Sequence, residues 1–355
     1  MTLTVIIITL NRPDCVRRCL DDLAAQNPPP DQVIVVDGSP DARTRDLCNQ
    51  RSEVLYLRND AGPGHMTRSR NIGLLEATGE IVAFVDDDAF VHENWRSEIL
   101  APYADPAVGA VGGRVIQGSS PPQPWVEIPK IGKLLPDGEL YAGFDTDSRR
   151  ILEVDHMMGC NMSFRAAVLA QLGGFRDDFP GISGICEDSD MSLRVRRLGH
   201  KILYNPNAVV THIGAPQFKG RRFDARYNFY GGHNNVLLLI RNFGLRTPIF
   251  YRFLVSTSTD RIRDVFRQFP SGPRAAAGAI YRGLAYFTGL FLGIAVGAFR
   301  RLRQGRSPFR SDAFAQSLRQ RLVHHQNLSH ARGFAKSRHD ELHDPTAINA
   351  STVSP

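Results

Sequence analysis

The stretch 81–90, IVAFVDDDAF, places five uncharged residues directly before three consecutive acids. Its apolar half, Ile81 to Val85, has the length and composition of a buried parallel strand. Asp86, Asp87 and Asp88 follow at the end of that strand. Three adjacent carboxylates repel one another unless they are fully solvated, share protons or surround a cation. Other parts of the sequence indicate which of these three states applies.

Charge is divided unevenly along the 355 residues. Residues 1–240 carry 25 Lys and Arg against 30 Asp and Glu, a net charge of −5, whereas residues 241–355 carry 18 against 6, a net charge of +12. The acidic part suits a cation-assisted site. The basic part suits an anionic partner, such as a membrane surface or, as the weaker alternative, RNA. The hydrophobic content of 42% is that of a globular chain with one large domain and an appendage.

Cysteine usage indicates a reducing compartment. The five cysteines are odd in number and form no CxxC pair, which argues against a zinc knuckle and a disulfide framework: Cys15, Cys19, Cys48, Cys160 and Cys186. The N-terminus, MTLTVIIITLNRP, has no basic segment and no small-residue cleavage site, so we interpret it as a first strand and not as a secretory signal.

Alternating strand and helix patterns predict an α/β fold. β-branched runs at Leu3–Thr9 and Gln32–Val36 enclose an apolar-periodic segment, Cys15–Ala25, as in a βαβ unit. Further strands are expected at Glu53–Leu57 and Ile81–Val85. We therefore predict a mostly parallel central sheet flanked by helices, followed by a C-terminal helical appendage.

Polar residues end three of the predicted strands. Thr9, Asn11 and Arg12 follow the first strand, Asp37 follows the second, and the triple Asp follows the fourth. Ligands of open α/β sheets bind at the carboxyl ends of the strands. We expect these side chains to line one pocket.

A second acidic group precedes a predicted helix in CEDSDMSLRVRRLGHKI. Glu187, Asp188 and Asp190 occupy the start of that helix, where negative charge is favoured. They either cap the helix and offset its arginines or supply a catalytic base, because a base must be a carboxylate or imidazole placed within reach of the proton it takes.

His212 directly follows a predicted strand, Ala208–Thr211. A lone histidine there is either a hydrogen-bonded loop residue or a third metal ligand beside Asp86 and Asp88. A hard divalent ion is held by few carboxylates and by substrate phosphates, and an imidazole ligand favours Mn²⁺ somewhat over Mg²⁺.

Seven blocks of this sequence, in order, resemble the motifs of family 2 glycosyltransferases of the glycosyltransferase A fold. They cover roughly residues 2–240 and are TVIIITLNRP, VIVVDGSPD, the span from GPGHMTRSRNIG to ATGEIVAFVDDDA, GCNMSFR, GGFRDDF, CEDSDMSLRVRRLGHKI and VVTHIG. The resemblance implies an inverting transfer of a sugar from a nucleotide-diphosphate sugar to a hydroxyl of a glycan or lipid-linked acceptor, with Mn²⁺ or Mg²⁺.

The resemblance also implies roles for individual residues. The donor, a UDP-, dTDP- or GDP-sugar, would be held by Thr9, Asn11, Arg12, Asp37, Arg70, Asp86 and Asp87. The metal would be bound by Asp86, Asp88 and His212. Asp188 would be the catalytic base, and the acceptor would contact Glu187, Gly159 and Asn161. The family often has two acids where this chain has only Asp37 before Gly38, so base recognition could differ.

The predicted organisation has three parts. Residues 1–240 form the catalytic domain, with a nucleotide-sugar-binding half (1–116), a loop insertion (117–155) and an acceptor and catalytic-base half (156–240). Residues 241–305 form a basic, partly apolar helical region that associates with membranes, and residues 306–355 form a disordered tail. We expect a cytoplasmic protein, peripheral or monotopic at the inner face of the plasma membrane. A nucleic-acid partner is not expected, because the basic region lacks the interleaved aromatics of a base-stacking platform.

Two other classes of function agree less well with the sequence. A sugar-phosphate nucleotidyltransferase would need a glycine-rich phosphate loop after the first strand, and TLNRP contains no glycine. An inactive membrane-binding scaffold would not need the full set Asp86, Asp88, Asp188 and His212.

Overall fold

The computed structural model describes residues 1–118, 130–181, 185–215, 224–268, 270, 272–304, 310 and 312–321. Within these residues a nine-stranded sheet has the strand order β3-β2-β1-β4-β10-β6-β11-β5, with β9 paired to β11. The strands are β1 (Leu3–Thr9), β2 (Gln32–Asp37), β3 (Val54–Arg58), β4 (Ile81–Asp86), β5 (Ala89–Val91), β6 (Val108–Gln117), β9 (Leu152–Glu153), β10 (Asn161–Arg165) and β11 (Lys201–His212).

The first four strands form a parallel sheet, as the sequence predicts. β1 lies between β2 and β4, and all seven of its residues are buried. The register sets Thr9 beside Asp37 and Ile8 beside Asp86, so the polar strand ends lie at one edge. β10 then runs antiparallel between β4 and β6. The predicted α/β class and the mostly parallel sheet are confirmed.

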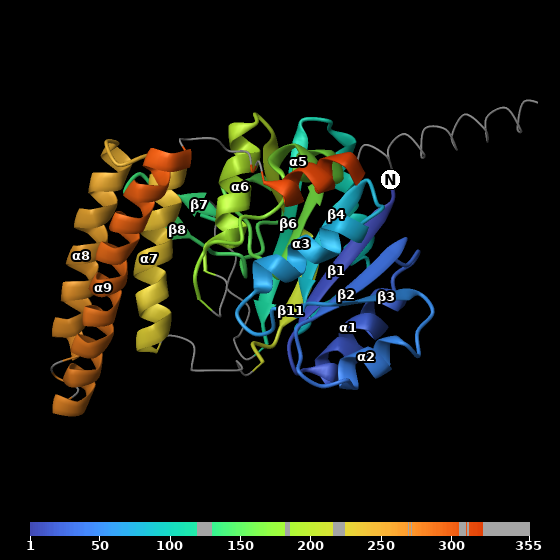
Figure 1. The fold of residues 1–355 in the computed structure, drawn as a ribbon, viewed down its shortest axis with the longest axis horizontal. Helices are drawn as coiled ribbons and strands as arrows, with labels where there is room; N and C mark the ends of the chain where they lie inside the picture. Colours follow the sequence, from blue (N-terminus) through green and yellow to red (C-terminus); the bar gives the residue numbers. More distant parts are fainter. Residues whose placement is uncertain are drawn as a thin grey trace, which may run out of the picture.

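Helices cover this sheet and extend beyond it. They are α1 (Pro13–Ala24), α2 (Arg43–Cys48), α3 (Met66–Glu76), α4 (Trp95–Leu100), α5 (Ala166–Leu172), α6 (Glu187–Arg197), α7 (Ala225–Asn242), α8 (Pro248–Gln268) and α9 (Pro273–Gln304). Figure 1 shows α3 lying across the sheet, while α7, α8 and α9 stand beside it as a separate layer. The predicted C-terminal helical appendage is therefore present.

The helical layer begins earlier than the expected boundary at residue 240. α7 starts at Ala225 and contributes to two apolar clusters. Leu237 and Leu238 pack with Leu193 of α6, whereas Val236 packs with Tyr286 of α9. α7 therefore joins the sheet domain to α8 and α9, and it cannot be assigned to the catalytic half alone.

Close backbone packing fixes α9 on α7. A Cβ atom at Gly289 would lie 1.9 Å from the carbonyl oxygen of Phe229, and one at Gly293 would lie 2.6 Å from that of His233. Only glycine allows this approach. The glycines spaced four apart in α9 therefore form a contact inside the protein.

The insertion expected at 117–155 is more ordered than predicted where the structure describes it. Its part 119–129 lies outside the described residues, but β7 (Lys133–Leu134) pairs with β8 (Leu140–Tyr141), and β9 pairs with β11. Phe144 is buried against Tyr204. A few apolar residues of this Gly- and Pro-rich segment pack against the sheet. Composition alone does not predict this contact.

Part of the segment expected to be a disordered tail is helical. Residues 313–321 form a helix, and most of the remainder of 306–355 lies outside the described residues. Asp312 accepts a hydrogen bond from the amide of Ala315 at the start of this helix, and Ala315 and Leu318 are fully buried. Arg310 donates to the carbonyl oxygen of Phe175. The spacing of the two buried residues over one helical turn explains why a mostly polar sequence packs here.

Candidate active site

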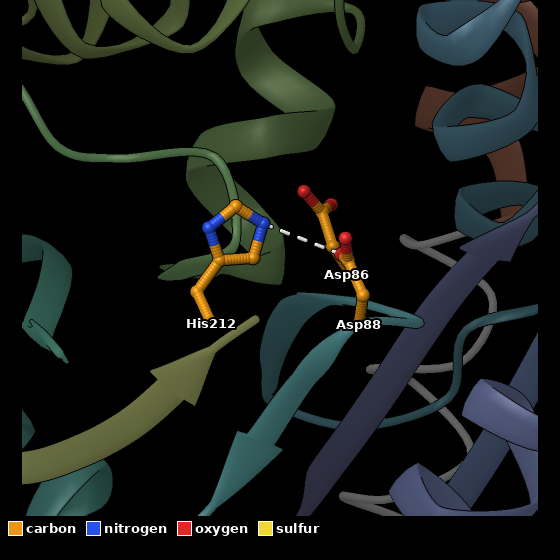
Figure 2. A group of neighbouring side chains, drawn as sticks. All are labelled: Asp86, Asp88 and His212. Carbon is orange, nitrogen blue, oxygen red and sulfur yellow. Dashed lines mark ion pairs between the residues drawn. The ribbon is translucent and has the colours of Figure 1, made fainter. Parts of the chain in front are cut away.

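Asp86, Asp87 and Asp88, here called the strand-end cluster, lie where β4 ends. The register of β11 with β5 sets His212 opposite Ala89 and so brings its imidazole beside Asp88. His212 Nε2 lies 3.3 Å from Asp88 Oδ1. One ligand atom from each of Asp86, Asp88 and His212 lies within 4.8 Å of the others, and Figure 2 shows the three side chains pointing toward one another. The predicted metal-ligand group is therefore assembled.

Arg12 supplies a built-in cation to this cluster. Its guanidinium lies 2.9 Å from Asp87 Oδ1 and 2.9 Å from Asp88 Oδ2. The hydroxyl of Thr9 donates to Asp87 Oδ2 at 2.7 Å. Thr9, Arg12 and Asp87, all predicted to contact the donor, thus form one bonded group beside the metal-ligand candidates.

The carboxyl groups of the cluster differ in acidity. Burial raises the pKa of Asp87 to about 7, although the charge of Arg12 opposes this. Burial also acts to raise the pKa of Asp88, but the hydrogen bond to His212, the charge of Arg12 and the amide of Ala215 outweigh it and lower the pKa to about 2. Burial raises the pKa of Asp86 despite Arg70. Asp88 is therefore the carboxylate held most firmly in its ionised form.

The residues present fit a divalent metal ion. Oδ1 of Asp86 is buried and accepts no hydrogen bond from any described residue, and its nearest cation, Arg70, is 3.6 Å away. Two carboxylates and one imidazole form a hard donor set that suits Mn²⁺ or Mg²⁺. A candidate metal site of Asp86, Asp88 and His212 is thus present.

Glu187, Asp188 and Asp190, here called the helix-tip cluster, lie in the first turn of α6. The side chain of Asp188 is partly exposed, whereas Glu187 and Asp190 are only 3% and 1% exposed. Asp188 Oδ2 accepts a hydrogen bond from the amide of Gly159 at 2.9 Å, and Oδ1 accepts one from the amide of Ser189 at 2.7 Å. Asp188 is therefore the one oriented carboxylate of this cluster that is not buried.

Asp190 serves the packing of the domain. Arg176 lies 2.9 Å from its Oδ1, and the side-chain amide of Asn242 in α7 donates to the same oxygen at 3.1 Å. The charge of Arg176 lowers the pKa of Asp190 against the effect of burial. For Asp190, the structure agrees with the interpretation that the acids cap the helix and offset nearby arginines.

Arg70 lies between the two clusters and is completely buried. Its guanidinium lies 2.8 Å from Glu187 Oε1 and 3.6 Å from Asp86 Oδ1. Burial and the neighbouring Asp188 raise the pKa of Glu187 to about 8, although Arg70 opposes them. Arg70 is predicted to contact the donor and Glu187 the acceptor. In the structure both side chains are buried and bonded to each other.

Asn161 does not fit its predicted acceptor role. It is fully buried in β10, accepts a hydrogen bond from Trp95 Nε1 at 3.0 Å and donates to the carbonyl oxygens of Ala208 and Arg114 at 2.8 and 3.1 Å. Its amide is used to join neighbouring strands. Gly159, in contrast, lies at the site, where a Cβ atom would be 2.9 Å from Arg70 Nη2 and 3.4 Å from Asp188 Oδ2.

The predicted nucleoside residues divide into two groups. Thr9 and Arg12 contact the strand-end cluster. Asp37 is buried and accepts hydrogen bonds from the amide of Ser39 at 2.8 Å and from the hydroxyl of Tyr56 at 3.1 Å. Asn11 has a φ of 58° and its amide donates to Ser39 Oγ at 2.7 Å.

Sequence reasoning overlooked the partners of these side chains. The Asp-x-Ser spacing of Asp37 and Ser39 is a recognisable turn signal, because Asp side chains bond the backbone two residues ahead. Tyr56 carries no such signal, since it reaches Asp37 only through the register of β3 beside β2. The amide of Ala215, which donates to Asp88 at 2.8 Å, is equally invisible in the sequence.

The chain is similar to characterised glycosyltransferases. Residues 4–173 match the family model described as glycosyl transferase family 2. The pre-mycofactocin glycosyltransferase of Mycobacterium tuberculosis is 28% identical over 232 residues, which are 64% of this chain and 46% of the relative. The glucosyl-dolichyl phosphate glucuronosyltransferase of Haloferax volcanii is 28% identical over 227 residues, 60% of this chain and 69% of the relative. The chain thus spans about half the length of the first of these relatives.

A solved structure shares the fold. The structure of GalNAc-T7 with UDP, GalNAc and Mn²⁺ superposes with a TM-score of 0.56 at 14% sequence identity, covering 86% of this chain and 58% of that one. The family match contains the strand-end cluster, Arg70 and Gly159, which the fold brings together with Asp188 and His212. Residues 4–173 thus match glycosyl transferase family 2, and the chain has the glycosyltransferase A fold.

Proposed function

We propose that this chain is an inverting glycosyltransferase that moves a sugar from a nucleotide-diphosphate sugar to a hydroxyl of a glycan or lipid-linked acceptor. The observation that carries the proposal is the proximity of the two acidic clusters. The buried Arg70 contacts Asp86 of one and Glu187 of the other, and Gly159 donates to Asp188 while its carbonyl oxygen lies 3.5 Å from Arg70. A metal-ligand group and a reachable base are thus held by the same few residues.

The strand-end cluster would hold the divalent ion. Asp86, Asp88 and His212 are its proposed ligands, with Mn²⁺ or Mg²⁺ as the ion. When bound, such an ion neutralises the negative charge that develops on a departing diphosphate. Arg12 adds a fixed positive charge at the same edge of the sheet, so we also assign it to the donor diphosphate side of the site.

Asp188 would act as the general base. Two backbone N–H groups orient its carboxylate and leave lone pairs for an acceptor hydroxyl. As the hydroxyl oxygen attacks the anomeric carbon, its proton passes to Asp188 and the sugar–phosphate bond breaks on the opposite face. A single displacement of this kind inverts the anomeric centre. One carboxylate at the acceptor side is sufficient for it.

The acceptor and location are inferred from the C-terminal part. The name of the Haloferax volcanii relative includes a dolichyl phosphate glucoside, which supports a lipid-linked acceptor here. Pro273–Leu302 contains an 18-residue stretch with a mean hydropathy of 1.5 and is long and apolar enough to cross a membrane, as some buried core helices also are. Together with the 18 basic and 6 acidic residues after residue 240, this supports action at the cytoplasmic face of the plasma membrane, on its anionic surface.

A donor screen tests the proposal. UDP-, GDP- and dTDP-linked sugars are each incubated with the full chain, with MnCl₂, with MgCl₂ and with EDTA, and both thermal stability and release of nucleoside diphosphate are measured. We expect one donor to stabilise the protein and to be slowly hydrolysed only when a divalent ion is present. Full hydrolysis in EDTA would contradict the metal role. Release of pyrophosphate from a nucleoside triphosphate and a sugar phosphate, without any donor hydrolysis, would replace the proposal with nucleotidyl transfer.

A further inference from the structure

The outer helices α8 and α9 carry most of the exposed large hydrophobic side chains. Of the 16 such residues in the described part of the chain, 11 lie on these two helices. On α9 they recur at helical spacing as one apolar stripe that consists of Ile280, Tyr281, Leu284, Phe291, Leu292, Phe299 and Leu302. At 1.5 Å per residue this stripe is about 30 Å long. On α8 they are Tyr251, Val255, Ile262 and Phe266.

The opposite face of α9 is committed to α7. Besides the contacts at Gly289 and Gly293, a Cβ atom at Gly232 of α7 would lie 2.3 Å from the carbonyl oxygen of Tyr286. Figure 1 shows α7 standing between the sheet domain and the outer helices. α9 could cross a bilayer only by leaving α7, and that would remove this backbone packing. The accessible part of the helix is therefore its stripe and not its whole circumference.

Charge indicates what the two helices contact. Residues 248–304 contain nine Arg and two Asp, a net charge of +7. Arg252, Arg267 and Arg274 are exposed, and of the two acids Asp260 pairs with Arg263 at 2.7 Å. Apolar side chains beside exposed arginines suit an anionic bilayer, into whose headgroup region such a surface settles. If two copies of the chain met through these helices, each would carry a net charge of +7 there, and the like charges would repel.

We propose that the outer faces of α8 and α9 form a lipid-binding surface, which holds α9 parallel to an anionic membrane instead of across it. The inference rests on the part of the proposed function that places the chain at a membrane. It does not depend on the metal ligands or on Asp188. Its partner is defined by chemistry, as a bilayer with anionic headgroups.

Vesicle flotation tests the surface. The full chain is mixed with phosphatidylglycerol-containing vesicles and with pure phosphatidylcholine vesicles, and the fraction that floats is measured at low and high salt. We expect flotation with the anionic vesicles alone, and its reversal by salt. Phe291→Asp is expected to weaken binding about tenfold or more, because a carboxylate replaces an apolar contact and repels the headgroups. Phe291 is 67% exposed, so the substitution leaves the core intact.

Ile151→Asp is the matched control, since Ile151 is 46% exposed on the sheet domain. It should float as the unaltered chain does. Equal flotation of Phe291→Asp and the unaltered chain would overturn the proposal, and so would protein that only detergent releases, which would show α9 inserted across the bilayer. A dimer in sedimentation velocity that Phe291→Asp dissociates, without vesicle binding, would reassign the surface to self-association. Donor hydrolysis by the same variants separates this failure from failure of the catalytic proposal.

Discussion

The strand-end cluster and the helix-tip cluster consist of the same kind of residue in different environments. Each has three acids within four consecutive positions. Each gives one acid to packing: Asp87 bonds Thr9 and Arg12, and Asp190 bonds Arg176 and Asn242.

The clusters diverge in the partners of their remaining acids. Asp88 faces the imidazole of His212, a second potential metal ligand, whereas Asp188 faces two backbone N–H groups. An imidazole beside carboxylates completes a cation site, while N–H donors orient a single carboxylate for proton transfer. The roles that we propose for the two clusters therefore depend on the neighbours that tertiary folding places beside them and not on the acids themselves.

Removing the arginine between the clusters should have the largest effect. Above about pH 8, where Glu187 is ionised, Arg70→Met leaves Glu187 and Asp86 without their shared buried cation, and breaking a buried pair in this way costs about 3–5 kcal/mol. Urea and thermal unfolding of the variant measure the loss. Arg43→Met, which breaks an exposed pair with Asp41, is the control and should change stability little. Similar losses in the two variants would show that Arg70 does not hold the clusters together.

Replacing each of the two aspartates of α6 by asparagine, in separate variants, should separate catalysis from packing. Asp188→Asn is expected to lower transfer by about 100-fold or more, equivalent to about 2.7 kcal/mol in the barrier, while donor and metal binding persist. Asp190→Asn should instead lower the melting temperature and keep the turnover per folded molecule, because Asp190 contacts Arg176 and Asn242. Rates are measured on the folded fraction of each variant. Retained transfer in Asp188→Asn would move the base to another group.

The pH dependence of stability should show the burial of Glu187. Its pKa is raised to about 8 in the folded chain from an ordinary value of 4.5, so between these values the folded state binds more protons than the unfolded state. Its contribution to stability is therefore present below about pH 4.5 and is lost as the pH rises toward 8. Glu187→Gln should flatten this decline, measured by unfolding at a series of pH values. A parallel decline in the variant would assign it to other groups.

Local sequence patterns predict most of the framework of the site. The apolar run 81–85 and the alternation of strands and helices predict β1, β2 and β4 and the edge where Thr9, Asp37 and Asp86 meet. These features depend on neighbours in sequence or on the general geometry of parallel sheets. The strand-end cluster is predicted for the same reason.

Long-range partners set the features that the sequence did not predict. Arg70 and Glu187 are 117 positions apart, and no local pattern indicates that they pair in the interior. Asn161 lies in a motif shared with the family, yet its hydrogen bonds to Trp95 and Ala208 make it a structural residue. The helix at 313–321 buries only a few side chains, and its position depends on contacts with residues near α5.

We propose that the strand-end cluster binds the metal and that the helix-tip cluster supplies the base. Measuring Mn²⁺ binding tests this proposal. Free Mn²⁺ is followed by electron paramagnetic resonance during titration of the unaltered chain, Asp88→Ala and Asp188→Asn, with and without UDP or GDP. We expect one site per chain in the unaltered protein, affinity reduced about tenfold or more in Asp88→Ala, and unchanged affinity in Asp188→Asn. Equal binding by Asp88→Ala and the unaltered chain, or loss of binding in Asp188→Asn, would contradict the assignment of the metal to the strand-end cluster.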